Sequence, residues 1–473
     1  MWEVRGALLF FLAACAATEP GEQTTNSSSA PTPPNIVILL ADDLGYGDLG
    51  CMGSQQIQTP HIDSLATEGV LFTQAYMSAS VCAPARAGLM TGRYQQRFGF
   101  EFNLVAPISG APEQQGLPLT ETTIATYLQG AGYRTAYFGK WHLGQSIPAF
   151  HPLERGFDEF FGHLEGSSNY WPKGEKSRLR RGREQITEPA VPYLTDALAE
   201  EACAFIHRQQ DAPFFCFVSF NAPHTPLQAK PEMLERYANL KPAGRRKYAG
   251  MVTSMDEAVG RVLDALDKEG LTDNTLVLFL NDNGGAVGYN HSLNPPLNGM
   301  KGTFLEGGVR VPMLVRWPGV WGANQRFDLP VSSLDVLPTC LAGAGVPLPA
   351  ELDGVDLMPH LAAGTGSNSG PGPHETLFWK LDTHAAVRHG DWKLIRLPDR
   401  APLLFDIAAD LGEFHDRTPE EPERVADLLA RLEAWESQLA SPLWRGSEAW
   451  REHKRQLYNN SYDRQQPPAP LPR

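Results

Sequence analysis

Five short apolar runs have the composition of strands buried on both faces of a sheet. Residues 122–128 and 251–267, between these runs, carry apolar side chains at helical spacing, and Gly130, Gly132 and Gly270 suit the ends of these helices. The alternation of strands and helices predicts an α/β fold with a large central sheet, mostly parallel but mixed, flanked by helices. The five runs lie at residues 35–40, 135–138, 214–220, 275–280 and 311–316.

The pattern changes beyond residue 363. Residues 364–373 are a linker rich in Gly, Ser and Pro. An amphipathic helix with Val425, Leu432 and Trp435 on one face closes the region. We expect a main domain at 35–363 and a C-terminal α+β subdomain at 374–473, in which a small antiparallel sheet packs on this helix. Its strand candidates lie at residues 376–380, 385–388, 392–396 and 403–405.

The N-terminus predicts a targeting segment. Residues 6–14 are apolar but too short to span a bilayer, which fits a secretory signal. They lead into Cys15, and Leu-Ala-Ala-Cys resembles the lipobox of bacterial lipoproteins, whose cysteine is acylated; a plain signal peptide that contains a cysteine is the alternative. We expect a signal peptide at 1–15, a flexible linker at 16–34, and a protein outside the cytoplasm, in the bacterial periplasm or at the outer membrane.

Composition and charge narrow the function. With 473 residues, 42% hydrophobic and 20% charged, the chain is an ordinary globular protein with one large core and a satellite domain. The formal net charge of −14 argues against bulk binding to nucleic acid. An anionic substrate must therefore be held by a few local cations. The sequence does not decide whether four further cysteines form disulfides, and we expect each of them to be a small buried apolar residue. They are Cys51, Cys203, Cys216 and Cys340.

Polar side chains follow four of the predicted strands. Because ligand groups gather at the carboxyl ends of strands in open α/β sheets, we expect these side chains to meet. Three carboxylates and an amide among them are oxygen ligands of the type that calcium or magnesium takes. In chain order the side chains are Asp42 and Asp43, Lys140 and His142, His224, and Asp282 with Asn283.

The stretch Cys82-Ala-Pro-Ala-Arg86-Ala-Gly-Leu-Met-Thr-Gly-Arg resembles the Cys-x-Pro-x-Arg…Thr-Gly-Arg signature of type I, formylglycine-dependent sulfatases. These belong to the alkaline phosphatase superfamily. The resemblance continues in Gly-Lys140-Trp-His142, in Asn-Ala-Pro-His224-Thr-Pro, around Lys301, and in residues 388–394. Ala85 stands where the family often has serine, and we expect only a modest effect on maturation.

The resemblance implies a covalent mechanism. A maturation enzyme converts Cys82 to Cα-formylglycine, whose hydrated aldehyde attacks sulfur through one oxygen and later expels sulfate by losing the proton of the other. One calcium ion lowers the pKa of the attacking hydroxyl. The implied ligands of that ion are Asp42, Asp43, Asp282, Asn283 and the modified residue 82.

The remaining roles follow from the same resemblance. Lys140 and Lys301 bind sulfate, and Arg86 orients the formylglycine. His142 takes the diol proton, and His224 protonates the leaving alcohol. Glu306 and Arg310 are left out of the site, since they can form a structural ion pair.

The expected function is hydrolysis of sulfate esters, on a sulfated carbohydrate. One alternative is a formylglycine-dependent phosphonate monoester or phosphodiester hydrolase, which shares the fold and the metal. The other is an inactive glycan-binding lipoprotein that has lost the nucleophile or the metal ligands. Every position of the set is filled in this chain, which disfavours the inactive protein unless Cys82 fails to mature.

Residues 97–118 and 165–192 are predicted insertions that face the substrate. Tyr170 and Trp171 in the second could stack on sugar rings. The same insertion is strongly basic, and it is either a solvated loop or a source of cationic contacts to a polysulfated chain. A lipid-anchored enzyme outside the cytoplasm suits polysaccharide degradation, which favours a sulfated glycan over an aryl sulfate. The basic residues are Lys173, Lys176, Arg178, Arg180, Arg181 and Arg183.

Overall fold

The computed structural model describes residues 1–3, 33–104, 114–174, 177–187, 193–209, 211–362, 372–446 and 448–463. Met1–Thr32 and Pro33–Arg473 are two separate units. Residues 4–15 of the predicted signal peptide (including Cys15), residues 16–32 of the predicted flexible linker, and residues 364–371 of the predicted second linker lie outside the described residues. In the described part of the chain, no helix has both the length and the apolar character needed to cross a membrane.

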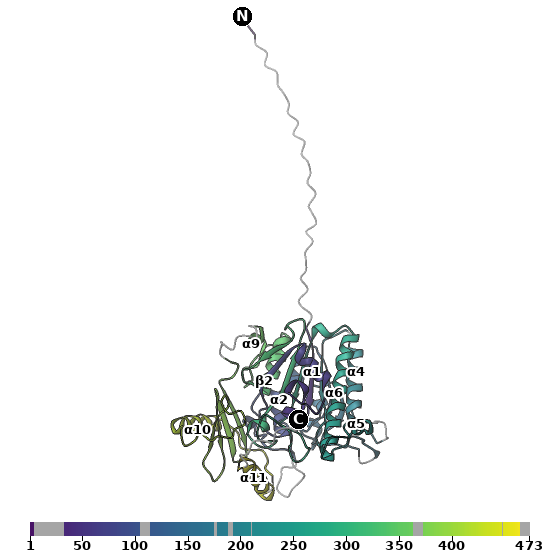
Figure 1. Cartoon of the computed structure of the whole chain (residues 1–473). Helices are drawn as coiled ribbons and strands as arrows, with labels where there is room; N and C mark the ends of the chain where they lie inside the picture. The colour runs from purple at the N-terminus through teal and green to yellow at the C-terminus, as the bar shows by residue number, and fades with distance from the viewer. Residues whose placement is uncertain are drawn as a thin grey trace. The chain divides into compact units, whose positions relative to one another are not determined.

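A mixed sheet of 11 strands, counted over the described residues, forms the centre of the Pro33–Arg473 unit (Figure 1). Its middle strands β8, β1, β7, β3 and β4 run parallel, while β9 is antiparallel to both β8 and β2. The predicted mostly parallel, mixed sheet is therefore confirmed. In order across the sheet the strands are β10 (Gln325–Phe327), β2 (Val70–Tyr76), β9 (Arg310–Arg316), β8 (Thr275–Asn281), β1 (Asn35–Ala41), β7 (Phe214–Ser219), β3 (Arg134–Lys140), β4 (Glu159–His163), β5 (Arg180–Arg181) and β6 (Glu184–Gln185), and β11 (Val331–Ser332) pairs with β2.

Helices cover both faces of this sheet because each central strand sends alternate apolar side chains to opposite sides. Ile36, Ile38 and Leu40 of β1 enter one core, and Val37 and Leu39 enter the other. The first core includes residues of α2 (Cys82–Thr91), α3 (Ile124–Gly130), α8 (Val336–Gly343) and α9 (Met358–Ala362). The second includes residues of α1 (Pro60–Thr67), α4 (Leu194–Arg208) and α6 (Ala243–Lys268), and α5 (Pro231–Arg236) packs against α6.

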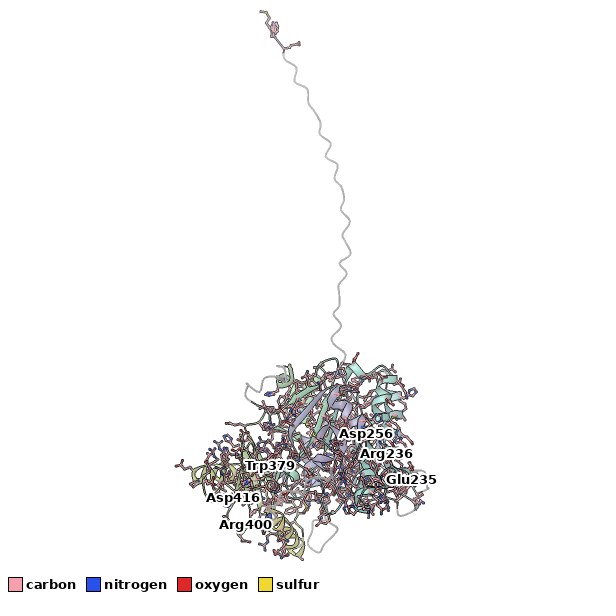
Figure 2. The ribbon with its side chains drawn as sticks, viewed as in Figure 1. Glu235, Arg236, Asp256, Trp379, Arg400 and Asp416 are labelled. Atoms are coloured by element: carbon pink, nitrogen blue, oxygen red, sulfur yellow. The ribbon has the colours of Figure 1, made fainter. Side chains whose placement is uncertain are left out.

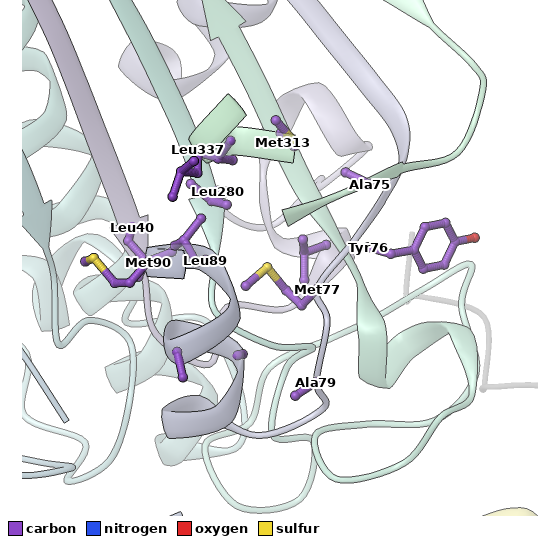
Figure 3. Packing of buried hydrophobic residues seen from close by; sticks show 14 of the residues in the cluster. Leu40, Ala75, Tyr76, Met77, Ala79, Leu89, Met90, Leu280, Met313 and Leu337 are labelled. Atoms are coloured by element: carbon purple, nitrogen blue, oxygen red, sulfur yellow. The ribbon is translucent and has the colours of Figure 1, made fainter. Parts of the chain in front are cut away.

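The first core contains the contact between the sheet and α2. Figure 3 shows Leu40 and Leu280, from β1 and β8, near Leu89 and Met90 of α2. All ten residues of α2 are buried. The helix that begins at Cys82 is thus fixed on the sheet along its whole length.

Helix α6 begins earlier than the sequence pattern predicts, at Ala243 rather than at residue 251. Its first turns contain Arg245 and Tyr248, which do not continue an apolar stripe. Both are nevertheless buried, because Arg245 pairs with Asp48 (2.7 Å) and the Tyr248 hydroxyl accepts a hydrogen bond from the Gly45 amide (3.0 Å). Satisfied polar groups replace apolar contacts there, and a hydrophobic pattern does not detect them.

The C-terminal region forms the predicted small antiparallel sheet. Leu428, Leu432 and Trp435 of α10 (Pro422–Glu436) pack on it, and α11 (Glu448–Asp463) follows. Trp379, labelled in Figure 2, donates its indole N–H to the Met77 carbonyl at 2.8 Å and joins the small sheet to the first core. The four strands, in order, are β12 (Thr376–Leu381), β13 (His384–His389), β14 (Trp392–Arg396) and β15 (Leu403–Asp406).

A buried ion network also joins this sheet to the main body. The ammonium of Lys393 in β14 lies 2.8 Å from Glu306 and 3.0 Å from Glu413. Glu306 begins α7 (Glu306–Val309) and also pairs with Arg310 at 3.1 Å. Glu306 and Arg310 thus form the ion pair that kept them out of the predicted site.

The described cysteines Cys51, Cys82, Cys203, Cys216 and Cys340 are all free. Cys216 and Cys340 are buried in the two cores, and Cys51 and Cys203 are partly exposed. Outside the candidate site, the four other cysteines thus act as small residues rather than as cross-links, and only Cys216 and Cys340 are buried as predicted.

Replacing Lys393 with methionine should destabilise the fold strongly. The substitution leaves Glu306 and Glu413 buried without their shared cation, and removal of one partner from a buried ion pair costs about 3–5 kcal/mol. Urea unfolding followed by tryptophan fluorescence measures the change. The control is Arg431→Gln, which removes an exposed pair with Asp427 and should cost less than about 1 kcal/mol. Equal losses in the two variants would contradict the role given to Lys393.

Candidate active site

Cys82 is the first residue of α2, and Arg86 lies one turn later on the same side of the helix. Val81 before it is extended, and Gly92 ends the helix in the left-handed conformation (φ 64°). The partial positive charge of a helix N-terminus therefore points at the position of Cys82. Both Cys82 and Arg86 are 1% exposed.

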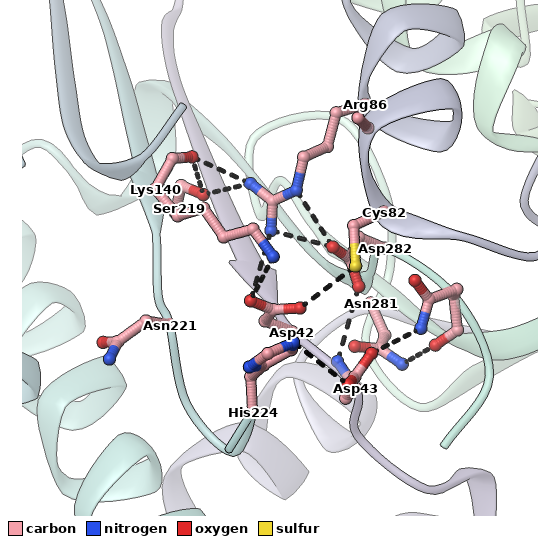
Figure 4. A network of polar contacts seen from close by, with 12 residues as sticks. Asp42, Asp43, Cys82, Arg86, Lys140, Ser219, Asn221, His224, Asn281 and Asp282 are labelled. Atoms are coloured by element: carbon pink, nitrogen blue, oxygen red, sulfur yellow. Dashed lines mark hydrogen bonds and ion pairs between the residues drawn. The ribbon is translucent and has the colours of Figure 1, made fainter. Parts of the chain in front are cut away.

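The acidic residues reach the same place from two neighbouring strands. β1 and β8 are parallel and aligned so that Ala41 is opposite Asn281, which brings Asp42 and Asp43 next to Asp282 (Figure 4). The side-chain nitrogen of Asn283 lies 2.7 Å from an Asp43 oxygen. The carboxyl groups of Asp42 and Asp282 are fully buried. Asp43 has a positive φ of 63°, which turns the chain directly after the strand.

Two lysines lie among these carboxylates. The Lys140 ammonium, from the end of β3, is 2.7 Å from an Asp42 oxygen. The Lys301 ammonium is 2.7 Å from an Asp43 oxygen and 3.0 Å from the Cys82 sulfur. The same sulfur lies 3.7 Å from the other Asp42 oxygen. Cys82 is thus the point at which the basic and acidic side chains meet.

Arg86 fixes the back of the cluster. Its Nε donates to Asp282 at 2.9 Å, and its other donors reach the Ser219 hydroxyl at 2.6 Å and the Lys140 carbonyl at 2.8 Å. Ser219 also donates to the Lys140 carbonyl. Because every one of these groups is buried, the guanidinium has a single position between β3, β7 and β8.

The two histidines are placed differently. Nδ1 of His224 donates to the Thr225 carbonyl (2.6 Å), which points Nε2 at Asp43 (3.6 Å). Nδ1 of His142 is buried, with no hydrogen-bond partner among the described residues, and the ring packs on the backbone at Gly166. His142 therefore borders the cluster, where the charges of Lys140 and Arg86 act on its ring.

Burial and charge set the ionisation of the cluster. Burial alone would raise the pKa of Asp42, but Lys140, His224 and Arg86 outweigh it and hold that pKa well below its usual value. Burial, together with the charge of Asp42, raises the pKa of Asp282 to about 6. Burial and Lys140 hold the pKa of His142 well below its usual value, so this imidazole is neutral.

The donor set fits a hard divalent cation. Ligand atoms of Asp42, Asp43, Cys82 and His224 lie within 4.8 Å of one another. The side-chain oxygen of Asn283 is buried without a hydrogen-bond partner among the described residues, while its nitrogen donates to Asp43 at 2.7 Å. Carboxylate and amide oxygens are the ligands that calcium and magnesium take. The residues present can hold such an ion.

Several residues of the cluster were not predicted from the sequence. Asn281 both donates to and accepts from the backbone of Leu44, and Asn290 donates to the Asp43 carbonyl at 2.8 Å. Ser219 holds Arg86 as described above. Asn221 is 2% exposed, and neither polar atom of its side chain has a partner among the described residues. Ser219 and Asn281 end strands β7 and β8, and this position at a strand end is the signal that could have found them.

A sheet that brings carboxylates, lysines, an arginine and histidines to a cysteine at a helix N-terminus is typical of a hydrolase of anionic esters. Comparison with known proteins gives the family. Residues 34–346 match the family model named Sulfatase, and residues 301–438 match the model for the C-terminal region of N-sulphoglucosamine sulphohydrolase. The chain belongs to the sulfatase family, as a type I sulfatase of the alkaline phosphatase superfamily, and it is a sulfuric ester hydrolase.

Individual sulfatases are similar to this chain over most of its length. The chain is 38% identical to arylsulfatase A of Homo sapiens, over 85% of this chain and 87% of that protein. It is 33% identical to steryl-sulfatase of Rattus norvegicus, over 84% and 87% of the two chains. The solved structure of Ps i-CgsB in complex with k-i-k-neocarrahexaose has 35% identity and a TM-score of 0.82, and the match covers 92% of this chain and all of that one.

Loss of the Ser219 hydroxyl should lower activity without unfolding the protein. In Ser219→Ala, Arg86 loses one acceptor and the Lys140 carbonyl loses one donor, so we expect kcat/KM for an aryl sulfate to fall roughly tenfold. The matched control is Ser254→Ala, since Ser254 is equally buried but donates to Gly250 within α6. A similar loss of activity in both variants would show that Ser219 has no specific part in the site.

Proposed function

We propose that this sulfatase cleaves sulfate esters of a carbohydrate, with a formylglycine made from Cys82 as nucleophile and one calcium ion beside it. The observation that carries the proposal is the setting of Cys82. Its side chain lies between the ammonium of Lys301 and the carboxylate of Asp42, at the N-terminus of a fully buried helix. The proposed metal ligands and catalytic residues are the ones named from the sequence. The ligands are Asp42, Asp43, residue 82, Asp282 and Asn283, and the catalytic residues are Cys82, Arg86, Lys140, His142, His224 and Lys301.

The thiol itself is a poor nucleophile in this position. Burial and the charge of Asp282 raise the pKa of Cys82 to about 12, although Lys140 and Lys301 oppose the rise. A thiol attacks as its thiolate, so almost none of the reactive form exists at neutral pH. Conversion to formylglycine supplies a hydrated-aldehyde hydroxyl in the same place, and this chemistry does not depend on the pKa of a thiol.

The charges of the cluster suit a sulfate group. Arg86, Lys140 and Lys301 supply three positive charges, and Asp42, Asp43 and Asp282 supply three negative charges when ionised. The side chains are thus close to neutral together, and a bound divalent cation makes the site positive. This local charge can attract an anionic ester to a protein whose formal net charge is −14. Lys301, already 3.0 Å from position 82, can donate to a sulfate oxygen there.

Calcium fits at the four oxygen-bearing side chains of the two strand ends. In our proposal Asp42, Asp43, Asp282 and Asn283 hold it. When bound, the ion supplies positive charge that lowers the pKa of the nucleophile and offsets charge on the sulfate oxygens. Asn290 and Asn281 keep the backbone around Asp43 and Leu44 in place, so that these ligands are oriented by their neighbours.

The histidines divide the proton transfers. His142 is kept neutral by burial and by Lys140, so it can accept the proton of the diol when sulfate leaves. His224 points Nε2 toward the cluster from a part-exposed loop, and we assign it the proton for the leaving alcohol. An unperturbed imidazole has a pKa near neutrality, which suits proton transfer. Burial lowers the pKa of both rings here, which favours the neutral form that His142 needs as a proton acceptor and requires His224 to be protonated when the anionic substrate binds.

The carbohydrate substrate and the location of the protein are proposed from the relatives and from the N-terminal sequence. Ps i-CgsB, solved in complex with a neocarrahexaose, aligns over 92% of this chain. Arylsulfatase A and steryl-sulfatase align nearly as far, and their names point to other substrates. The signal-like N-terminus and the lipobox at Cys15 support a lipoprotein outside the cytoplasm, matured by a formylglycine-generating enzyme. We propose the glycan because an anchored enzyme suits polysaccharide breakdown.

Replacing Cys82 with alanine should abolish sulfate release while leaving the fold intact. The matured wild-type protein should carry an aldehyde at position 82, which mass spectrometry of the peptide and reaction with a hydrazide can detect. Ion chromatography of free sulfate, with sulfated saccharides and an aryl sulfate as substrates, measures the activity. Cys340→Ala, which removes a thiol buried in the hydrophobic core, is the control. Undiminished activity in Cys82→Ala would exclude the proposed nucleophile.

The same substrate panel can distinguish a sulfatase from the alternative, a phosphonate monoester hydrolase. A phosphonate monoester is added to the substrate panel, because its single negative charge resembles that of a sulfate ester. Faster turnover of the phosphonate than of any sulfate ester would favour the phosphonate hydrolase over a carbohydrate sulfatase. We expect the reverse order.

Chelation should remove activity reversibly. Treatment with EGTA should abolish turnover, and added calcium should restore it at lower concentration than magnesium, because the ligand set is all oxygen and magnesium releases its water reluctantly. Asn283→Leu should raise the calcium concentration needed for half-maximal activity by roughly tenfold or more. Asn274→Leu, at an exposed turn before β8, should leave the requirement unchanged. Full activity in EGTA would contradict the metal assignment.

A further inference from the structure

A pocket of about 700 Å³ lies beside the candidate active site. Its volume is in the range of roughly 300–1,000 Å³ that small-molecule sites occupy. Its walls come from residues 165–173, from the segment 177–185 and from Pro226. A single sulfate group does not need so much space, so the pocket has room for a larger part of a substrate.

The pocket wall is bound to the histidine loops of the site. Nε2 of His142 would lie 2.7 Å from a Cβ built on Gly166, and the His142 amide donates to the Leu164 carbonyl. The Tyr170 hydroxyl contacts the carbonyls of Asn221 and His224 at 2.7 and 2.8 Å. Pro226 lines the pocket two residues after His224. A substrate whose ester group enters the cluster therefore extends toward this pocket.

The sequence suggests that Tyr170 and Trp171 stack on sugar rings, but in the structure the two side chains have different surroundings. Tyr170 is fully buried, and its ring stacks on Tyr193, so its proposed contact with sugar is wrong. Trp171 is only partly buried and lines the pocket. An aromatic side chain at a pocket wall offers an apolar face to a sugar ring.

The basic residues of the loop are also divided. Lys173, Arg178 and Arg180 line the pocket, and Lys173 and Arg178 are exposed, with no ion pair to any described residue. Arg181 and Arg183 instead pair with Glu201 and Glu154. Lys176 lies outside the described residues. The unpaired cations of the loop thus gather at the pocket, against the overall negative charge of the protein.

One acidic group lines the same pocket. Glu165 has a carboxylate oxygen that is buried without a hydrogen-bond partner in the described structure. A pocket made for a bare anion would not include a carboxylate. A sugar satisfies both features, because its hydroxyls can donate to Glu165 while a charged substituent pairs with Lys173 and Arg178.

We propose that this pocket is a subsite for a neighbouring sugar unit that carries a second anionic group, either a sulfate ester or a carboxylate. Lys173, Arg178 and Arg180 pair with that group, and Trp171 packs on the ring. The inference rests on the proposed carbohydrate sulfatase function and specifies its substrate as a saccharide with more than one negative charge.

The test compares three disaccharides of the same sugar sequence: one with a single sulfate, one with a second sulfate on the neighbouring unit, and one with a uronate there. The matured wild-type protein should have the highest kcat/KM for a doubly charged disaccharide, and the preference between the second sulfate and the uronate identifies the anion. In Lys173→Gln/Arg178→Gln, kcat/KM for the doubly charged substrate should fall about tenfold more than for the singly charged one. Added salt should reduce the wild-type preference.

Arg181→Gln/Arg183→Gln is the matched control, because it also removes two positive charges from the same loop but from residues that pair with Glu201 and Glu154. Its preference should equal that of the wild type. Wild-type protein that does not distinguish the three disaccharides would overturn the subsite, and so would an unchanged preference in the double variant.

An aryl sulfate and a binding measurement separate this inference from the proposed function. If the aryl sulfate is hydrolysed but the disaccharides are not distinguished, only the subsite fails. Calorimetry on Cys82→Ala protein with the disulfated disaccharide tests the pocket without turnover. Binding that weakens about tenfold with Lys173→Gln/Arg178→Gln supports the subsite even if no sulfate is released, and binding that does not change overturns it.

Discussion

The site depends on mutual neutralisation of buried charges. Asp42 and Asp282 are fully buried, which would be strongly unfavourable without cations, and Arg86 and Lys140 supply them at 2.9 and 2.7 Å. Loss of one partner from such a pair typically costs about 3–5 kcal/mol. The ends of β1, β3 and β8 and the start of α2 are therefore fixed relative to one another. This constraint holds Cys82 at one point, between Lys301 and Asp42.

A second buried network extends this constraint to Lys301. Glu306, five residues later, pairs with Lys393 of the C-terminal sheet, and its amide donates to Glu413. On the other side, the amide of Gly302 donates to the Ser80 carbonyl, just before α2. The loop that carries Lys301 is thus held between the C-terminal sheet and the start of α2. The small sheet therefore has a part in positioning Lys301, the lysine that we propose binds sulfate, as well as in stability.

Much of this arrangement could be predicted from the sequence, because buried parallel strands leave continuous apolar runs and their carboxyl ends share one edge. These two facts are enough to place Asp42 beside Asp282. The strand-end position also marks Ser219 and Asn281 as candidates, but it does not reveal what they do, because their hydrogen bonds to the main chain and to Arg86 leave no mark in the hydrophobic pattern. The prediction for Tyr170 was wrong, because sequence proximity to Trp171 does not say which aromatic ring faces the core. The proposed roles of the site residues come from the resemblance to sulfatase motifs, because the spacing of apolar residues carries no information about chemistry.

The most direct test of the account is a crystal structure of Cys82→Ala protein with calcium and a sulfated disaccharide. The account predicts a cation about 2.3–2.6 Å from oxygens of Asp42, Asp43, Asp282 and Asn283, and a sulfate group in contact with Lys140 and Lys301 next to position 82. A cation bound elsewhere would contradict it. So would a sulfate group away from residue 82 while Lys301 remains paired with Asp43.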